Sequence, residues 1–358
     1  MQTAPSHLRD LVHLLALAVL LAVALYYGRP YLAPIAVAVL IWFLINALAD
    51  ALRARAPRVP GWAATLAAVA TLFGLMLFVA RIIAENAGAL SAGLDGVEAK
   101  LLATVDAVLA RFGLEHRVDF EMLLSGLRLE ALARDAFDAA RALVGDVVLV
   151  FLYVMFLLVD QRFYVAKLNA LVPDPARRAA LRATLRHVAE EVRAYLWLMT
   201  LISAGVGVAT WAICLLFGVS GAGFWGFLAF GLNFIPTIGS ILAVTFPVIY
   251  ALLQVDSAAP VLAMIAMLAG VQFLAGEIVL PRVMGDRLNM SGFVILLSLV
   301  VWGALWGPVG MFLAIPIMVI LMIVFAQFPA TRPIAIGLSR AGAVADAGRG
   351  EAALTPRD

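Results

Sequence analysis

Three polar side chains, Asn233, Gln272 and Glu277, interrupt apolar stretches in the C-terminal half of this sequence. A charged side chain at the centre of a bilayer costs roughly 2.5–3.5 kcal/mol or more, so a carboxylate there should face a cavity or a partner. Glu277 is therefore a candidate for binding a cation or carrying a proton, or it pairs with Arg282 at the membrane interface. Gln272 lies more than one helical turn before Glu277 and on another face, and we assign it to the same solute or ion pathway.

Asn233 begins the sequence Asn-Phe-Ile-Pro, and Pro236 removes a backbone donor and clashes with the preceding turn of a helix. Gly239 follows three residues later and relaxes the backbone. The Asn233 amide can contact a solute, or it can satisfy backbone groups that Pro236 leaves open. The two roles do not exclude each other.

The sequence contains no complete catalytic motif of the enzyme classes considered below. Gly218-Val219-Ser220-Gly221 matches the G-x-S-G of rhomboid intramembrane proteases, which also need a histidine base in a later span. The histidines are His7, His13, His116 and His187, all before Ser220. No nucleotide-binding fingerprint or zinc-protease motif appears, and the single cysteine, Cys214, excludes a multi-cysteine metal site. We therefore expect no enzyme and no cofactor, and transport that is passive or driven by an ion gradient.

The stretch 223–253 is apolar but too long for one ordinary span, because about 20 residues cross the hydrocarbon. Asn233, Pro236 and Gly239 predict a break near its middle. Broken backbone at membrane depth persists only against protein or a water-filled cavity, and interrupted segments point to a transporter's binding region.

A second overlong apolar segment, 292–327, is interrupted by Gly307-Pro308-Val309-Gly310. Gly223 precedes Pro247 by 24 residues, and Gly292 precedes Pro316 by 24 residues. We hypothesise two copies of one helix–break–helix element, inverted with respect to each other as in alternating-access transporters. The alternative is a chance match among common residues. The hinge or break positions that we expect are Pro247, Pro281, Gly285, Gly307, Pro308, Gly310 and Pro316.

The composition predicts an all-α polytopic membrane protein. Hydrophobic residues make up 65% of the chain and charged residues 13%, against roughly 45–50% and about 25% in soluble domains. The formal net charge of +2 gives no indication of a nucleic-acid partner. We expect about eight transmembrane segments, namely two broken or hairpin-like helices near the C-terminus and six ordinary spans at 11–27, 31–49, 62–83, 142–159, 194–217 and 259–280.

The remaining chain is organised around these spans. We expect three spans within 1–84, an extracytoplasmic amphipathic helical insert at 85–141, a fourth span at 142–160, a cytoplasmic basic linker at 161–193, a C-terminal transport core at 194–328 and a disordered cytoplasmic tail at 329–358. Arginines concentrate in the 50–60 connector, the basic linker and the tail. The positive-inside rule then places both termini in the cytoplasm.

Residues 220–320 resemble the autoinducer-2 exporter family. The motifs are Asn233-Phe234-Ile235-Pro236-x-Ile238-Gly239, then Glu277-x-x-Leu-Pro281-x-x-Met-Gly285, Leu288-x-Met-Ser291 and Leu297-Ser298-x-x-x-Trp302-Gly303-x-x-x-Gly307-x-x-Gly310-x-x-x-Ala314-x-Pro316. The order of spans fits along nearly the whole chain, least in 85–141. Members often have a proline where this chain has Ser291-Gly292. The resemblance implies a multi-pass permease of the bacterial inner membrane.

The resemblance implies export of an autoinducer-2-like signal, or sodium/proton exchange as in some members. A small polar solute needs hydrogen-bond partners such as Asn233, whereas an antiporter of monovalent cations and protons needs a titrating carboxylate such as Glu277. A third alternative is a non-transporting scaffold organised by the insert at 85–141. The partners that we expect are the lipid bilayer, the solute or ion, and further copies of the chain in a homo-oligomer.

Overall fold

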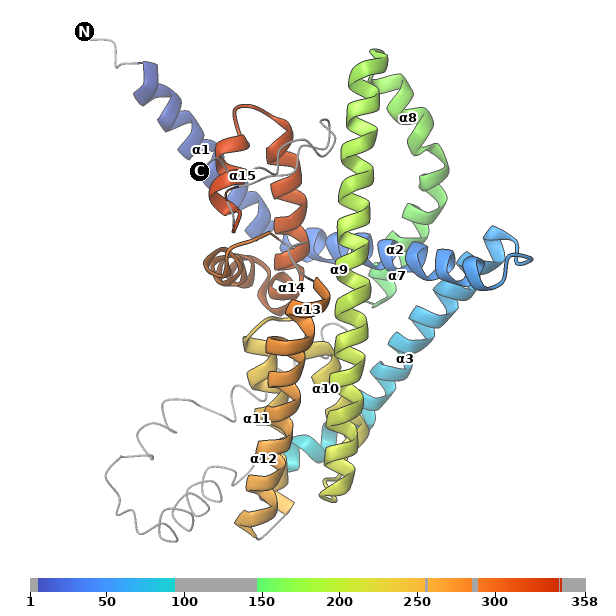
Figure 1. The fold of residues 1–358 in the computed structure, drawn as a ribbon, viewed down its shortest axis with the longest axis vertical. Coiled ribbons are helices and arrows are strands. Elements are labelled where there is room, and N and C mark those ends of the chain that lie inside the picture. The colour runs from blue at the N-terminus through green and yellow to red at the C-terminus, as the bar shows by residue number, and fades with distance from the viewer. Residues whose placement is uncertain (1–5, 94–146, 255–256, 285–288, 341, 343–358) are drawn as a thin grey trace. The chain divides into compact units, whose positions relative to one another are not determined.

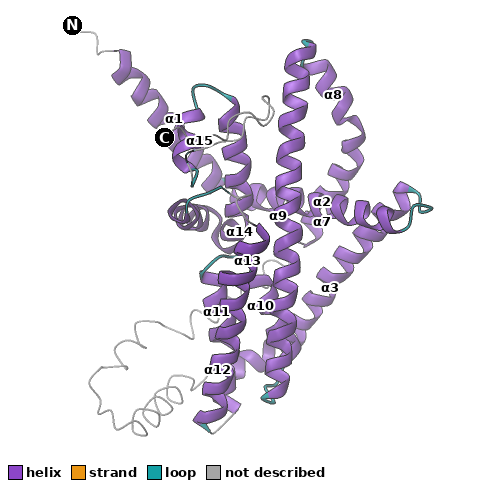
Figure 2. Ribbon diagram, in the orientation of Figure 1, coloured by secondary structure: helices purple, strands orange, loops and turns teal. Residues whose placement is uncertain are grey.

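The structure is a computed structural model and describes residues 6–93, 147–254, 257–284, 289–340 and 342. Throughout these residues the ordered elements are helices, and the only strand-like pairing is a single antiparallel bridge between Met290 and Ser339 (Figures 1 and 2). The predicted all-α fold is confirmed. Most of the predicted insert lies outside the described residues.

The chain divides into two compact units. Unit 1 comprises Met1–Leu44, Val148–Ala194 and Arg287–Asp358. Its helical elements are α1 (Ser6–Tyr27), the first part of α2 (Arg29–Arg55), α7 (Val147–Asp160), the 3-10 turn Gln161–Phe163, α8 (Tyr164–Leu171), the first part of α9 (Pro175–Leu216), α14 (Gly292–Gln327) and α15 (Arg332–Leu338).

Unit 2 comprises Ile45–Val147 and Tyr195–Asp286. Its helical elements are the end of α2, α3 (Gly61–Gly93), the remainder of α9, α10 (Ala222–Leu232), α11 (Ile238–Gln254), α12 (Ala258–Phe273), a π-helical turn (Leu274–Val279) and α13 (Leu280–Met284).

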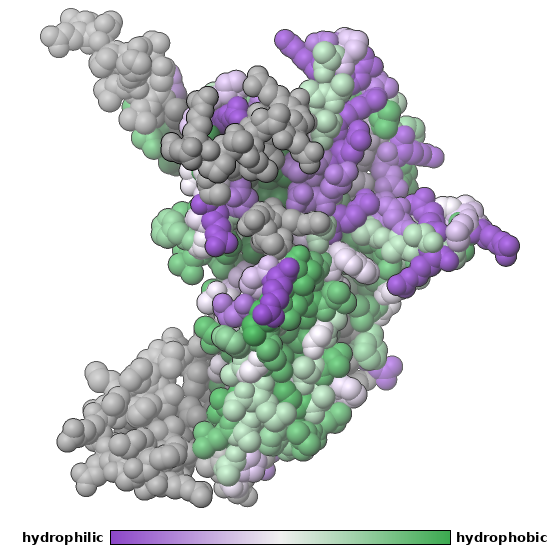
Figure 3. Space-filling view, in the orientation of Figure 1, coloured by the Kyte–Doolittle hydropathy of each residue, from purple (hydrophilic) through white to green (hydrophobic). Residues whose placement is uncertain are grey.

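Six helical segments in the described part of the chain are long and apolar enough to cross a membrane: Arg29–Arg55, Gly61–Phe78, Val147–Leu171, Pro175–Leu216, Ala259–Val283 and Gly292–Gln327. Shorter apolar helices are Leu15–Tyr27, Ala222–Leu232 and Ile238–Leu252. Many large apolar side chains on these helices are exposed, among them Leu20, Leu77 and Val208. The surface over α11 and α12 is almost wholly hydrophobic (Figure 3), as a surface that faces lipid should be.

Helix α9 joins the predicted basic linker to the predicted fifth span without a break in the helix. It runs for 42 residues without interruption, about 63 Å at 1.5 Å per residue, although its first half is charged and its second half apolar. The basic part is tied to the chain before it, because Arg182 donates to Asn169 on α8 and Arg178 donates to the carbonyl of Pro173 at 2.9 Å. The alanine, arginine and glutamate residues at the junction favour helix, so hydropathy changes there while the backbone does not.

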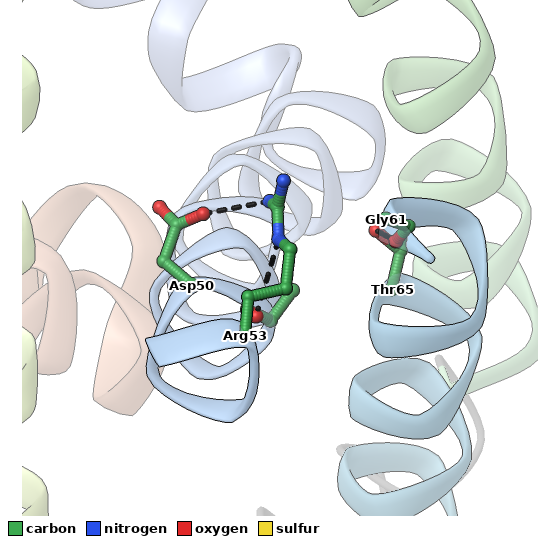
Figure 4. Close-up of polar contacts among 5 residues, drawn as sticks. Asp50, Arg53, Gly61 and Thr65 are labelled. Atoms are coloured by element: carbon green, nitrogen blue, oxygen red, sulfur yellow. Dashed lines mark hydrogen bonds and ion pairs between the residues drawn. The ribbon is translucent and has the colours of Figure 1, made fainter. Parts of the chain in front are cut away.

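The predicted basic connector at 50–60 is helical up to Arg55, where α2 ends, and α3 begins at Gly61. Arg53 pairs with Asp50 at 2.7 Å and also donates to the carbonyl of Ala49, while Thr65 bonds back to the carbonyl of Gly61 (Figure 4). These contacts lie within the end of α2 or within the start of α3. Arg55 and Arg58 are exposed.

The prediction of a disordered tail is wrong for the part that the structure describes. Residues 332–338 form α15, in which Ala335 is completely buried, and Ser339 is buried beside it. The backbone N–H of Arg340 donates to the carbonyl of Asn289 at 2.9 Å. A small, polar composition suggested disorder, but Ala335 packs because it is small. Residues 343–358 lie outside the described part.

Candidate functional site

The predicted break in 223–253 separates α10 from α11. Helix α10 ends at Leu232, Asn233 caps it, and α11 begins at Ile238. Thr237 adopts a left-handed conformation with φ of 64°, which lets the chain reverse after Pro236. The segment 222–254 is therefore two helices joined by a five-residue break, and we call it the first hairpin.

Both ends of the first hairpin are closed by specific contacts. At its open end the backbone N–H of Ser220 donates to the side-chain oxygen of Gln254 at 2.9 Å. At the break, Gly239 lies so close to Leu232 that a Cβ would collide with the Leu232 carbonyl group, standing 2.7 Å from its carbon. The hairpin was one of two readings that the sequence left open, and these contacts decide it.

Asn233 is buried at the break and bonds across to α9. Its Nδ2 donates to the hydroxyl of Ser203 at 2.9 Å, and Ser203 is fully buried. The backbone groups around it are largely paired locally, with Asn233 N–H donating to Ala229 and Gly239 N–H to Ile235. The side-chain amide is thus not needed as a local cap and is the principal polar group that the break adds to the interior of unit 2.

Two glycines bring α9 and α10 close enough for this bond. A Cβ on Gly207 would stand 2.7 Å from the carbonyl oxygen of Gly226, and a Cβ on Gly226 would stand 2.7 Å from that of Gly207. Small residues at helix crossings allow such backbone contact in membranes. Ser203 lies one turn before the crossing on α9, which positions its hydroxyl toward the end of α10.

Gln272 follows the buried residues Met264 and Leu268 on α12 and precedes buried Ala275 in the π-helical turn. Its Oε1 atom is buried and has no hydrogen-bond partner in the described structure. The neighbouring residues Val271 and Ala275 pack in one cluster with residues of α9, α10 and α11, which include Ile202 and Leu232 beside the Ser203–Asn233 bond. A buried acceptor without a partner costs about 1–3 kcal/mol, so it needs a donor from elsewhere.

Glu277 lies in the π-helical turn and is exposed on the surface of unit 2. No ion pair joins it to Arg282 within the described residues. We expected a hinge or break at Pro281, but the helix does not end there, because α13 continues to Met284. Pro281 lacks the N–H that would bond to the Glu277 carbonyl in an α-helix, and a π turn absorbs this defect. An exposed carboxylate on a membrane helix must face water, headgroups or another protein surface.

The second predicted break is a sharp bend inside α14. Gly307 has φ of 64° and ψ of −145°, and Pro308 starts the following helical half. A Cβ on Gly310 would collide with the carbonyl group of Trp302, standing 2.6 Å from its carbon. Residues eight positions apart in a straight α-helix are separated by about 12 Å, so this contact requires the two halves to fold toward each other.

The other predicted hinge positions have mixed outcomes. Pro247 and Pro316 are buried inside α11 and the second half of α14, and both helices continue through them. They are packing positions and not ends of helices. Gly285 lies outside the described residues.

Comparison with known proteins decides the family. The family described as AI-2E family transporter matches residues 14–330, which include both breaks. The chain belongs to this family. Among its relatives, the AI-2 transport protein TqsA of Escherichia coli K12 is 28% identical over 332 residues, covering 92% of this chain and 95% of TqsA.

Two further relatives match over about half and about three fifths of their length. The putative transport protein YhhT of Escherichia coli K12 is 37% identical over 175 residues, covering 49% of each chain. A putative transport protein of Borreliella burgdorferi is 33% identical over 218 residues, covering 61% of this chain and 60% of that protein. Together with the apolar helices, the family establishes a multi-pass membrane protein with a transport role.

Sequence reasoning missed two partners in this AI-2E transporter. Ser203 is an ordinary small residue in an apolar span, 30 positions from Asn233, and no local pattern singles it out. The indole of Trp306 bonds to the carbonyl of Leu25, 281 positions away.

Proposed function

We propose that this chain exports a small polar solute, of the kind represented by autoinducer-2 (AI-2), by alternating access around its two helix breaks. The family and the name of TqsA support the solute class. Each break supplies a glycine, Gly239 or Gly310, packed against a backbone carbonyl. Such tight joints can change angle without exposing long runs of backbone to lipid.

The hydrogen bond between Asn233 and Ser203, buried in an apolar unit, is the main support for this proposal. A buried amide is expensive to desolvate, and an apolar pair of similar size would pack as well. The Oε1 atom of Gln272, whose neighbours Val271 and Ala275 pack in the cluster with Ile202 and Leu232, is a buried acceptor without a donor in the described structure. Hydroxyl groups of a polyol can donate to Gln272 and exchange bonds with Asn233, so we assign these two side chains to solute contact.

Efflux from proteoliposomes loaded with AI-2 tests this proposal. Asn233→Ala and Gln272→Leu should each reduce the efflux rate about tenfold, since each removes one solute bond in a dry site. Thr245→Ala is the matched control, because among the described residues the Thr245 hydroxyl bonds only to the carbonyl of Ile241 in its own helix. Equal rates for all three variants and the unmodified chain would refute the assignment.

A second candidate function rests on the exposed carboxylate of Glu277. A monovalent cation/proton antiporter needs a titrating group that reaches water, and Glu277 sits on a π turn, an irregularity frequent at functional sites. An imposed pH gradient separates the candidates. Sodium-driven proton movement that is lost in Glu277→Gln supports the antiporter, and its absence with AI-2 efflux intact supports export.

The cellular arrangement belongs to the same proposal. We place the protein in the bacterial inner membrane with both termini in the cytoplasm, from the arginines of the 50–60 connector and the basic linker. We assign subunit contacts in a homo-oligomer to 85–141. Deletion of this segment should leave transport measurable. Loss of a cellular phenotype with transport intact would instead favour the scaffold role.

A further inference from the structure

The turn between α1 and α2 is fastened to the bend of α14. The indole Nε1 of Trp306 donates to the backbone carbonyl of Leu25 at 3.0 Å. Trp306 is only 5% exposed and immediately precedes Gly307, where the helix bends. Because α1 ends at Tyr27, the Leu25 carbonyl is one of the last four in the helix, which lack an intrahelical partner. This hydrogen bond therefore pairs one carbonyl at the end of α1 and joins that end to the bend of α14.

Arg29 covers the same bend from the first residue of α2. Its Nη2 lies 3.0 Å from the position that a Cβ on Gly307 would occupy, and its Cζ lies 3.6 Å from that position. The guanidinium reaches this close because Gly307 has no side chain. Pro308 lacks the N–H that a continuous helix would offer to an earlier carbonyl, so a cation with several donors suits this place electrostatically.

The α1–α2 turn is hydrogen-bonded on both sides of Gly28. Gly28 N–H donates to the Ala24 carbonyl and Leu32 N–H donates to the Gly28 carbonyl, both at 2.8 Å. A Cβ on Gly28 would stand 2.6 Å from the Ala24 oxygen and 2.8 Å from Leu32 Cδ1. The turn is therefore closely packed about Gly28. It holds the Leu25 carbonyl and Arg29 together beside the bend.

We infer that Trp306 and Arg29 form a latch between the α1–α2 turn and the bend of α14, and that the bend opens only when the indole leaves the Leu25 carbonyl. This opening is the movement of α14 in the transport cycle, a step that rests on the proposed function. Trp306 and Arg29 are positioning residues. They act through the bend and not through contact with the solute.

Cysteine alkylation in native membranes tests the latch without any solute. Cys214 is the only cysteine and is buried, so Cys214→Ala gives a cysteine-free background. Val309→Cys, two residues beyond Gly307, then reports opening of the bend to N-ethylmaleimide. Trp306→Phe removes the donor and keeps an aromatic ring, and it should raise the alkylation rate about fivefold, as loss of one ordinary hydrogen bond predicts.

Trp302→Phe is the matched control. Trp302 lies one turn earlier with its ring 5.1 Å from that of Trp306, and within the described residues its indole N–H makes no hydrogen bond. In Trp302→Phe, the alkylation rate of Val309→Cys should equal the rate in the Cys214→Ala, Val309→Cys chain with both tryptophans. Equal rates for Trp306→Phe and Trp302→Phe would overturn the latch. Arg29→Gln is the second variant if Trp306→Phe does not reach the membrane, and an unchanged rate there would overturn it equally. Because no solute is present, failure of AI-2 export would leave this result standing.

Discussion

The two helix breaks share a backbone device and differ in the side chains they carry. In each, a glycine that follows the break, Gly239 or Gly310, packs on the carbonyl of the last helical turn before it. The first break spans residues 233–237 and buries an amide bonded to α9. The bend at Gly307 carries an indole bonded to α1. The same close contact between a glycine and a backbone carbonyl thus accompanies a buried amide in unit 2 and an indole bonded to α1 in unit 1.

The difference also shows how a break is tolerated in lipid. In the first hairpin the backbone groups at the break pair locally, for example Ile235 N–H with the Leu232 carbonyl at 2.8 Å. At the bend of α14 the covering groups come from a distant turn. The first break is therefore largely self-sufficient in backbone bonds, whereas the second depends on tertiary contacts.

The largest expected effect comes from a methyl group at either joint. Gly239→Ala and Gly310→Ala place a Cβ into a backbone carbonyl, which cannot rotate away as a side chain does. Each should lower the free energy of unfolding by about 3 kcal/mol, the upper end of overpacking effects. Thermal unfolding in detergent measures this. The controls are Gly231→Ala and Gly292→Ala, which meet nothing within 4 Å. Equal stability of variants and controls would show that the shared joint is not tightly packed.

A smaller effect, specific to the first break, should follow from Gly226→Val. The added side chain would press on Trp211 and on the Gly207 carbonyl and separate α9 from α10. We expect a loss of about 2 kcal/mol in unfolding free energy. Gly223→Val, three residues away with nothing within 4 Å, should cost far less. If both variants unfold at the same temperature, the crossing does not position Ser203.

The Ser203–Asn233 bond should have a modest coupling energy. Double-mutant cycles in membrane proteins give about 0.6 kcal/mol on average and at most about 1.7 kcal/mol. We expect Ser203→Ala and Asn233→Ala to couple within this range when unfolding is followed in detergent. Additive effects of the two substitutions would mean that the amide has no energetic link to α9.

Glu277→Gln should have the smallest effect on stability. The carboxylate is exposed and, in the described part of the chain, pairs with no cation, so the unfolding free energy should change by less than about 0.5 kcal/mol. Circular dichroism melts of both proteins measure this. A large loss would indicate a buried role that the position of Glu277 does not suggest.

Sequence reasoning predicted the features that depend on local chemistry. Proline and glycine constrain their own backbone, so Pro236 and Gly307 located both breaks. At Pro281 the helix continues, because a π turn can absorb a proline without ending the helix. Sequence reasoning misjudged residues 332–338, whose helix depends on burial of Ala335. Contacts between distant spans, such as that of Ser203, leave no periodic signal.

The central claim is that solute binds at the tip of the first hairpin. In the Cys214→Ala background, Thr237→Cys places a thiol at an exposed position of that tip, and Val309→Cys places one at the bend of α14. AI-2 should slow maleimide labelling of residue 237 and protect residue 309 much less, since only the first break carries the amide. Unprotected labelling of residue 237 in a protein that still exports AI-2 would contradict the claim.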